Sequence, residues 1–219
     1  APPNPYLSEI ERLSPSQRIA LAAQATSEQN PGPHTGEISV SMLKSVGVSY
    51  VIVGHSEMRA RGLSDEIISL TLKVILKNKL TPVLCVGESA RDTNGDYFSL
   101  VETQLVRALQ GLARKDLKNL IVAYEPVWAI GTGKNATAED VNEMNLFIEK
   151  VLTDQFGRSV ARNIRLIYGG SINSRNVDGL LEQSTATGFL VGGASLKASE
   201  FLSIIKSTNQ HAKKHLAKN

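Results

Sequence analysis

Two residues with acid–base side chains lie just beyond short apolar segments of the chain. Glu125 directly follows the segment Leu120–Tyr124 and precedes Pro126, which stiffens the backbone after it. A carboxylate in this place can act as a general base, or it can only pair with a nearby Arg or Lys. His55 lies one residue beyond the segment Tyr50–Val53, where it can act as an acid–base group or only as a structural hydrogen-bonding group.

Three glycine-rich segments are candidates for binding phosphate through free backbone N–H groups. Each alone could be a tight turn, but three that fall on one face of a fold favour an anion site. The nucleotide motif GxxxxGK[ST] is absent, and no GxGxxG follows a strand. Together with Glu125 and His55, the three glycine-rich segments predict acid–base chemistry on a small phosphate ester. The three segments are Gly131-Thr132-Gly133, Gly169-Gly170-Ser171 and Gly192-Gly193.

The scaffold for these residues is predicted by an alternation of two kinds of segment. Amphipathic stretches with helical spacing separate short apolar runs, and one of them begins with a capping box, Thr137 and Asp140. Such alternation indicates βαβ units and a parallel sheet, with no linker to divide a single domain over residues 1–219. The polar motifs follow five successive strands, which favours a ring of strands, where all the strand ends converge, over an open sheet. The six predicted strands are Ile19–Ala23, Tyr50–Val53, Pro82–Val86, Leu120–Tyr124, Arg165–Tyr168 and Gly188–Val191.

Composition narrows the class of protein further. The net charge is +3, and much of the surplus lies in the last fourteen residues, without aromatic side chains that could stack on bases. We therefore expect a solvated final helix and no nucleic-acid partner. The apolar runs are far shorter than the ~18 residues of a membrane span, so no membrane partner is expected either. The single Cys85 excludes an internal disulfide and is typical of a reducing compartment, which predicts a cytoplasmic location.

Four motifs together resemble the triosephosphate isomerase family, in order and at similar spacing, from residue 1 to about residue 206. The most specific is the twelve-residue stretch from Ala123 to Lys134, AYEPVWAIGTGK. The others are Gly54-His55-Ser56-Glu57, Tyr168-Gly169-Gly170-Ser171, and the stretch from Leu190 to Ser195, LVGGAS.

The resemblance implies a TIM-type (β/α) barrel that interconverts dihydroxyacetone phosphate and D-glyceraldehyde 3-phosphate without cofactor or metal. It implies that Glu125 is the catalytic base and that neutral His55 polarises the carbonyl, supported by Ser56 and Glu57. It also implies phosphate binding by backbone N–H groups of Gly131, Ser171, Gly192 and Gly193. A loop would close over the substrate and exclude water. That loop comprises Pro126, Val127, Trp128, Ala129, Ile130, Gly131, Thr132, Gly133 and Lys134.

The start of the family pattern is not found in these 219 residues. Family members open with a strand that ends in Asn-x-Lys, then a helix and a second strand, so the expectation here is an incomplete barrel of six strands and seven helices. Absence of the lysine that neutralises the substrate predicts weak activity. Open strand edges predict a homo-oligomer, a dimer or tetramer, that covers the open side. Two alternatives stay open. One is a catalytically retired barrel that binds phosphorylated ligands or acts as an assembly subunit, and the other is a piece of an ordinary family member.

Overall fold

The computed structural model describes residues 1–13, 19–130 and 135–216. The chain forms two compact units, one of residues 1–86 and 103–121, the other of residues 87–102 and 122–219. Each unit is described by itself below. The prediction of a single domain stays a prediction.

Five strands are found in the described residues, and the three of the first unit, β1, β2 and β3, pair in chain order. The pairings of β1 with β2 and of β2 with β3 are parallel, as the alternation of strands and helices requires. The strands are β1 (Leu21–Ala23), β2 (Val48–Val53), β3 (Thr81–Val86), β4 (Ile121–Tyr124) and β5 (Arg165–Tyr168).

The predicted sixth strand, Gly188–Val191, is wrong as a strand. It makes only one isolated parallel bridge, Tyr168 to Phe189, although Tyr168 both donates to Gly188 and accepts from Leu190. The last backbone hydrogen bond to β5 comes from Leu190, and the 3₁₀ turn Gly193–Leu196 begins three residues later, so the pairing stays too short for a strand. At the other end of the sheet, Ile19 is 68% exposed, and β1 begins two residues later than predicted.

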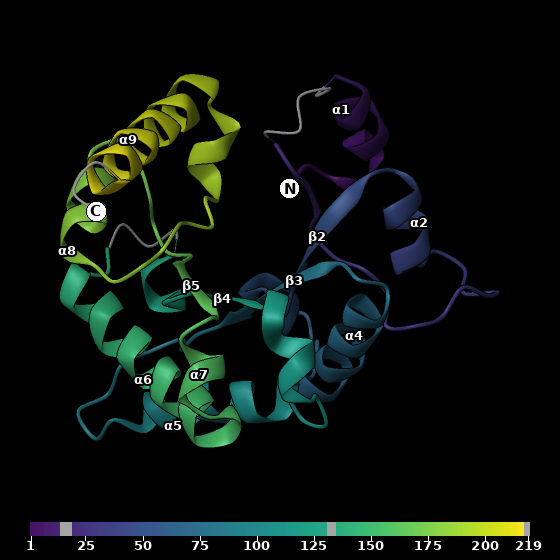
Figure 1. Ribbon diagram of the computed structural model, residues 1–219, viewed down its shortest axis with the longest axis horizontal. Helices are drawn as coiled ribbons and strands as arrows, with labels where there is room; N and C mark the ends of the chain where they lie inside the picture. Colours follow the sequence, from purple (N-terminus) through teal and green to yellow (C-terminus); the bar gives the residue numbers. More distant parts are fainter. Residues whose placement is uncertain (14–18, 131–134, 217–219) are drawn as a thin grey trace. The chain divides into compact units, whose positions relative to one another are not determined.

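The first unit places helix α4 (Asp65–Lys77) beside β2 and β3 (Figure 1). Ser64 caps this helix, and its hydroxyl accepts a hydrogen bond from the backbone N–H of Ile67. Ile68, Leu72 and Ile75 are fully buried, so one face of this amphipathic segment lies in the core. The other helices are α1 (Leu7–Leu13), α2 (Val40–Ser45), α3 (Ser56–Ala60), and the 3₁₀ turns Asn4–Tyr6 and Arg114–Asn119; α5 (Asp96–Ala108) joins the two units in sequence.

The second unit is built on the long helix α6 (Ala138–Phe156), which follows the predicted capping box. Thr137 and Asp140 each bind the other's backbone N–H, and the buried stripe includes Val141, Met144 and Ile148. Helix α8 packs against α9 (Figure 1). The remaining elements are α7 (Arg158–Ala161), α8 (Val177–Gln183), α9 (Ala198–Leu216), and the 3₁₀ turns Val127–Ala129 and Gly193–Leu196.

The described residues contain nine α-helices, where seven were expected. The difference comes from two glycines in the left-handed region, Gly62 (φ 96°) and Gly157 (φ 87°). Gly62 separates the one-turn α3 from α4, and Gly157 separates α6 from the one-turn α7. None of the helices in the described part of the chain is long and apolar enough to cross a membrane.

Candidate active site

His55 is held at the end of β2 by its own helix. It is the N-cap of α3, and its Nδ1 atom accepts a hydrogen bond from the backbone N–H of Glu57 at 3.3 Å. Because Nδ1 is the acceptor, the ring proton of a neutral imidazole lies on Nε2, which can then donate. Gly54 before it has φ 74°, and a Cβ there would lie 3.1–3.2 Å from Ile68, Arg59 and Cys85. Only glycine lets the chain turn so closely into His55.

Arg59 fixes this strand end and was not predicted as a site residue. Its Nε donates to the carbonyl of Gly54 at 2.8 Å, and Nη2 donates to the carbonyl of Cys85 at 3.3 Å. Nη1 forms an ion pair with Asp65 at 2.6 Å, at the start of α4. One guanidinium thus joins the ends of β2 and β3 to a helix. Two of its three partners are backbone carbonyls, which leave no trace in a sequence.

Glu125 lies at the end of β4 and is only 2% exposed. Two glycines form the walls beside it. The backbone of Gly87 packs against the carbonyl group of Glu125, and a Cβ on Gly169 would lie 3.0 Å from the Glu125 Cγ. Gly169 also donates its N–H to the carbonyl of Tyr124 at 2.7 Å. The predicted base is therefore a buried residue, with one glycine against its backbone carbonyl and another beside its Cγ.

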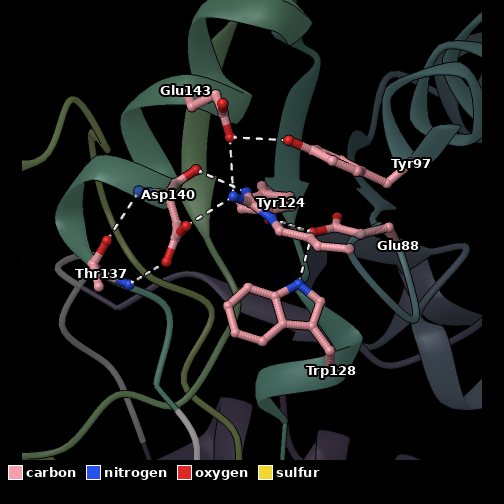
Figure 2. A network of polar contacts seen from close by, with 8 residues as sticks. Glu88, Tyr97, Tyr124, Trp128, Thr137, Asp140 and Glu143 are labelled. Atoms are coloured by element: carbon pink, nitrogen blue, oxygen red, sulfur yellow. Dashed lines mark hydrogen bonds and ion pairs between the residues drawn. The ribbon is translucent and has the colours of Figure 1, made fainter. Parts of the chain in front are cut away.

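Glu88 belongs to a polar network that includes Tyr124 and Trp128, which precede and follow Glu125 in sequence (Figure 2). Its side chain is fully buried, and its Oε1 accepts from the Trp128 indole N–H at 2.7 Å and the Tyr124 hydroxyl at 2.8 Å. Its backbone carbonyl accepts from the N–H of Val127 at 2.9 Å. The residues on both sides of Glu125 are thus bound to Glu88. Glu88 follows a buried strand in the sequence, and that position was the signal for a site residue.

Arg91 is the cation of this network and was also missed. Its Nε donates to Glu88 Oε1 at 3.1 Å, and its Nη1 pairs with Asp140 at 2.7 Å and with Glu143 at 2.9 Å. Burial alone would lower the pKa of Arg91, but the hydrogen bonds that it donates to Tyr124 and Glu88 and the charge of Asp140 raise it above its ordinary value. Burial and the charge of Glu88 raise the pKa of Tyr124. Both side chains therefore keep their protons at any physiological pH.

The predicted closing loop begins with an ordered turn. After buried Pro126, Val127–Ala129 form one 3₁₀ turn, and the N–H of Ile130 donates to the carbonyl of Val127 at 3.1 Å. Ile130 is 36% exposed. The rest of the predicted loop, Gly131, Thr132, Gly133 and Lys134, lies outside the described residues.

The other residues that are predicted to bind phosphate lie in the second unit. Gly192 and Gly193 are exposed at the start of the 3₁₀ turn Gly193–Leu196, and a Cβ on either would meet nothing within 4 Å. Ser171 is half-buried, and its carbonyl accepts from Asn176 at 2.9 Å. The segment Gly169-Gly170-Ser171 does not lead straight into a helix. A turn follows it, in which the Asn176 side chain accepts from the N–H of Asn173, and α8 begins only at Val177.

Tyr168 directly precedes Gly169-Gly170-Ser171 in sequence and is fully buried. Its hydroxyl has no hydrogen-bond partner within the described residues, although the N–H groups of Ala136 and Ser171 face it. Burial raises the pKa of Tyr168 to about 12, against the opposing effect of those two N–H groups. This hydroxyl is an orphaned polar group beside the predicted phosphate segments.

The predicted residues divide between the two units. His55, Ser56 and Glu57 belong to the first, with Ser56 half-buried and Glu57 exposed; Glu125, Ser171, Gly192 and Gly193 belong to the second. Over residues 1–13, 19–130 and 135–216 no three His, Cys, Asp or Glu side chains are grouped so that they could hold a metal ion.

Known proteins were compared with this chain. The triosephosphate isomerase family profile matches residues 1–208. Triosephosphate isomerase of Carboxydothermus hydrogenoformans is 42% identical over 209 residues, which cover 94% of this chain and 83% of the relative. That of Geobacter metallireducens is 44% identical over 207 residues, 94% of this chain and 82% of the relative. That of Thermoanaerobacter sp. is 42% identical over 206 residues, which cover 93% of this chain and 83% of the relative. The chain therefore belongs to the triosephosphate isomerase family.

Proposed function

We propose that this chain interconverts dihydroxyacetone phosphate and D-glyceraldehyde 3-phosphate with Glu125 as the base and His55 as the electrophile. The pairing of base and electrophile is that of the family. Glu125 takes a proton from the carbon beside the carbonyl and returns it to the neighbouring carbon. The Nε2–H of His55 donates to the carbonyl oxygen, whose charge grows as the enediolate forms.

The observation that carries this proposal is the burial of Glu125. Glu125 is 2% exposed, with Gly169 beside its Cγ and Gly87 against its own backbone carbonyl, so little water reaches this residue. Exclusion of water protects the enediolate phosphate from side reactions.

The substrate's phosphate group is proposed to bind at Ser171, Gly192 and Gly193, with Gly131 of the closing loop. The open space in front of Gly192 and Gly193 supports this, since a phosphate must approach the backbone closely. Supporting roles for Ser56 and Glu57 follow from the hydrogen bond between the Glu57 N–H and His55.

Two further properties are proposed with the activity. Self-association as a dimer or tetramer is supported by short β1, which pairs with β2 and has the exposed Ile19 before it. A cytoplasmic location is supported by a chain whose single cysteine, Cys85, is buried and forms no disulfide. Sedimentation at micromolar concentration tests the first, and a stable monomer would contradict it.

Turnover of glyceraldehyde 3-phosphate by the pure 219-residue chain tests the activity. Reduced turnover is expected, since none of its lysines lies in a motif like the family's substrate-neutralising one. Glu125→Asp moves the carboxylate by ~1 Å and is expected to lower kcat on the order of 10²-fold. Lys150→Gln, at an exposed pair on α6, is the control and keeps full activity. Equal turnover in wild type and Glu125→Asp would contradict the role of Glu125. Ligand binding without any turnover would instead favour the retired barrel.

A further inference from the structure

Arg91 makes bonds to three separate segments of the second unit. Through Nε it binds Glu88, three residues before it. Through Nη2 it donates to the Tyr124 hydroxyl at 3.2 Å, at the end of β4. Through Nη1 and Nη2 it binds the side chain and the carbonyl of Asp140 and the side chain of Glu143, in the first two turns of α6. The guanidinium also lies 5.0 Å from the ring centre of Tyr97 and 5.5 Å from that of Trp128.

The charge of Glu88 explains why this cation is needed. The carboxylate is fully buried, with three donors on Oε1 and no hydrogen-bond partner for Oε2 among the described residues. A buried carboxylate without a cation is strongly unfavourable. Arg91 supplies the positive charge, and Asp140 and Glu143 hold Arg91 on the rigid helix α6.

The position of Glu88 ties this network to the predicted base. Tyr124 immediately precedes Glu125, and its hydroxyl binds both Glu88 and Arg91. Val127 and Trp128 follow Glu125 by two and three residues, and both bind Glu88. The backbone that carries Glu125 is therefore fastened on both sides to one ion pair.

We propose that Arg91 is a positioning residue for the isomerase reaction, which fixes Glu125 through Glu88, Tyr124 and Trp128. The inference rests on the proposed function, because it concerns the placement of the same base. Arginine is required because its planar fork serves four side chains at once, whereas the ammonium group of lysine is a compact point charge. The effect of Arg91 passes through the residues on either side of Glu125, because Arg91 binds Tyr124 directly and Trp128 through Glu88.

The experiment compares Arg91→Gln, Arg91→Lys and Arg107→Gln. Arg107 is 58% exposed in a loose pair with Glu66 at 3.9 Å, so it controls for the same change of residue. Each variant is assayed for kcat and KM, and its fluorescence is recorded. Trp128 is the only tryptophan in the chain, so the emission reports directly on the indole that binds Glu88.

Arg91→Gln is expected to lower kcat by up to about 10²-fold with little change in KM, because a misplaced base slows chemistry without removing a substrate contact. Its Trp128 emission is expected to shift in the folded protein. Arg91→Lys is expected to restore part of kcat, and Arg107→Gln to match the wild type in both measurements.

Unchanged kcat and unchanged emission in Arg91→Gln would overturn the inference, as would a loss confined to KM. If Arg91→Gln does not fold, Glu143→Gln serves instead. It removes one outer anchor that is 48% exposed, and the same shift in emission with a smaller loss of kcat is expected. A wild-type chain without turnover would overturn the proposed function as well, whereas an active wild type with an equally active Arg91→Gln overturns the role of Arg91 alone.

Discussion

The backbone of Gly87 packs directly against the carbonyl group of Glu125, so that any side chain at residue 87 would overlap it. Gly87→Ala must therefore push the two segments apart and displace Glu125. We expect a loss of kcat on the order of 10²-fold for a shift of ~1 Å. Steady-state kinetics of the folded variant, checked by circular dichroism, measures this effect.

Gly179→Ala is the matched control for that substitution. Gly179 lies inside α8 in the same unit, and a Cβ there would meet nothing within 4 Å. We expect full activity and a gain in stability of about 0.5–1 kcal/mol, because alanine favours a helix over glycine. If both variants lost activity equally, the contact between Gly87 and Glu125 would not be the cause.

A negatively charged side chain at residue 193 should repel the substrate's phosphate group. Residue 193 has open space for a side chain, so Gly193→Asp and Gly193→Asn should both fold. We expect a several-fold higher KM for the aspartate variant than for the asparagine variant, since the two differ only in charge. Calorimetric titration with inorganic phosphate is the second measurement. Identical affinities in the two variants would place the phosphate elsewhere.

Two buried tyrosines differ in what their hydroxyls bind. The Tyr124 hydroxyl bonds to Glu88 and Arg91, while that of Tyr168 has no hydrogen-bond partner in the described part of the chain. Tyr124→Phe is expected to lower the free energy of unfolding by about 1–3 kcal/mol, because it leaves charged partners unsatisfied. Tyr168→Phe is expected to change it little. Urea unfolding of both variants checks this, and equal losses would refute it.

The raised pKa of Tyr168 also predicts a pH dependence. Its ordinary pKa of 10.0 is raised to about 12 in the folded chain, so the folded state holds the proton more tightly than the unfolded state. The contribution of Tyr168 to the free energy of unfolding is fully present below pH 10, and it is lost as the pH rises from 10 to 12. Tyr168→Phe should flatten that part of the curve. The free energy of unfolding of wild type and of Tyr168→Phe is measured from pH 9 to 12. Equal slopes of this free energy against pH in the two proteins would contradict the prediction.

Arg59 is expected to stabilise the first unit far more than an exposed arginine does. Arg59→Gln removes the ion pair with Asp65, in which the Arg59 side chain is 17% exposed and the Asp65 side chain 14% exposed. It also removes the hydrogen bonds that Arg59 donates to two carbonyls at strand ends. We expect a loss of about 3 kcal/mol in unfolding free energy. The control Arg107→Gln should lose less than about 0.5 kcal/mol. Thermal unfolding that ranked the two variants equally would contradict this expectation.

The sequence was most informative where a residue's role depends on its own segment. Glu125 follows a strand of four buried residues, and Thr137 begins α6, because strand patterning and capping are local effects. The sixth strand was overpredicted because an apolar run at residues 188–191 carries no information on how many pairing partners it finds. Arg59, Glu88 and Arg91 were missed as site residues because their partners lie up to 52 residues away or are backbone carbonyls. Such contacts exist only once the chain has folded.

The two carboxylate oxygens of Asp140 have different partners. One oxygen accepts from the N–H of Thr137 and starts α6, and the other pairs with Arg91. Asparagine could still accept from Thr137 but would leave Arg91 without that charge, and glutamate would keep the charge but reach past the cap. Helix initiation and the charge that holds Arg91 thus depend on one side chain, and of the two functions only the cap would survive its replacement by asparagine.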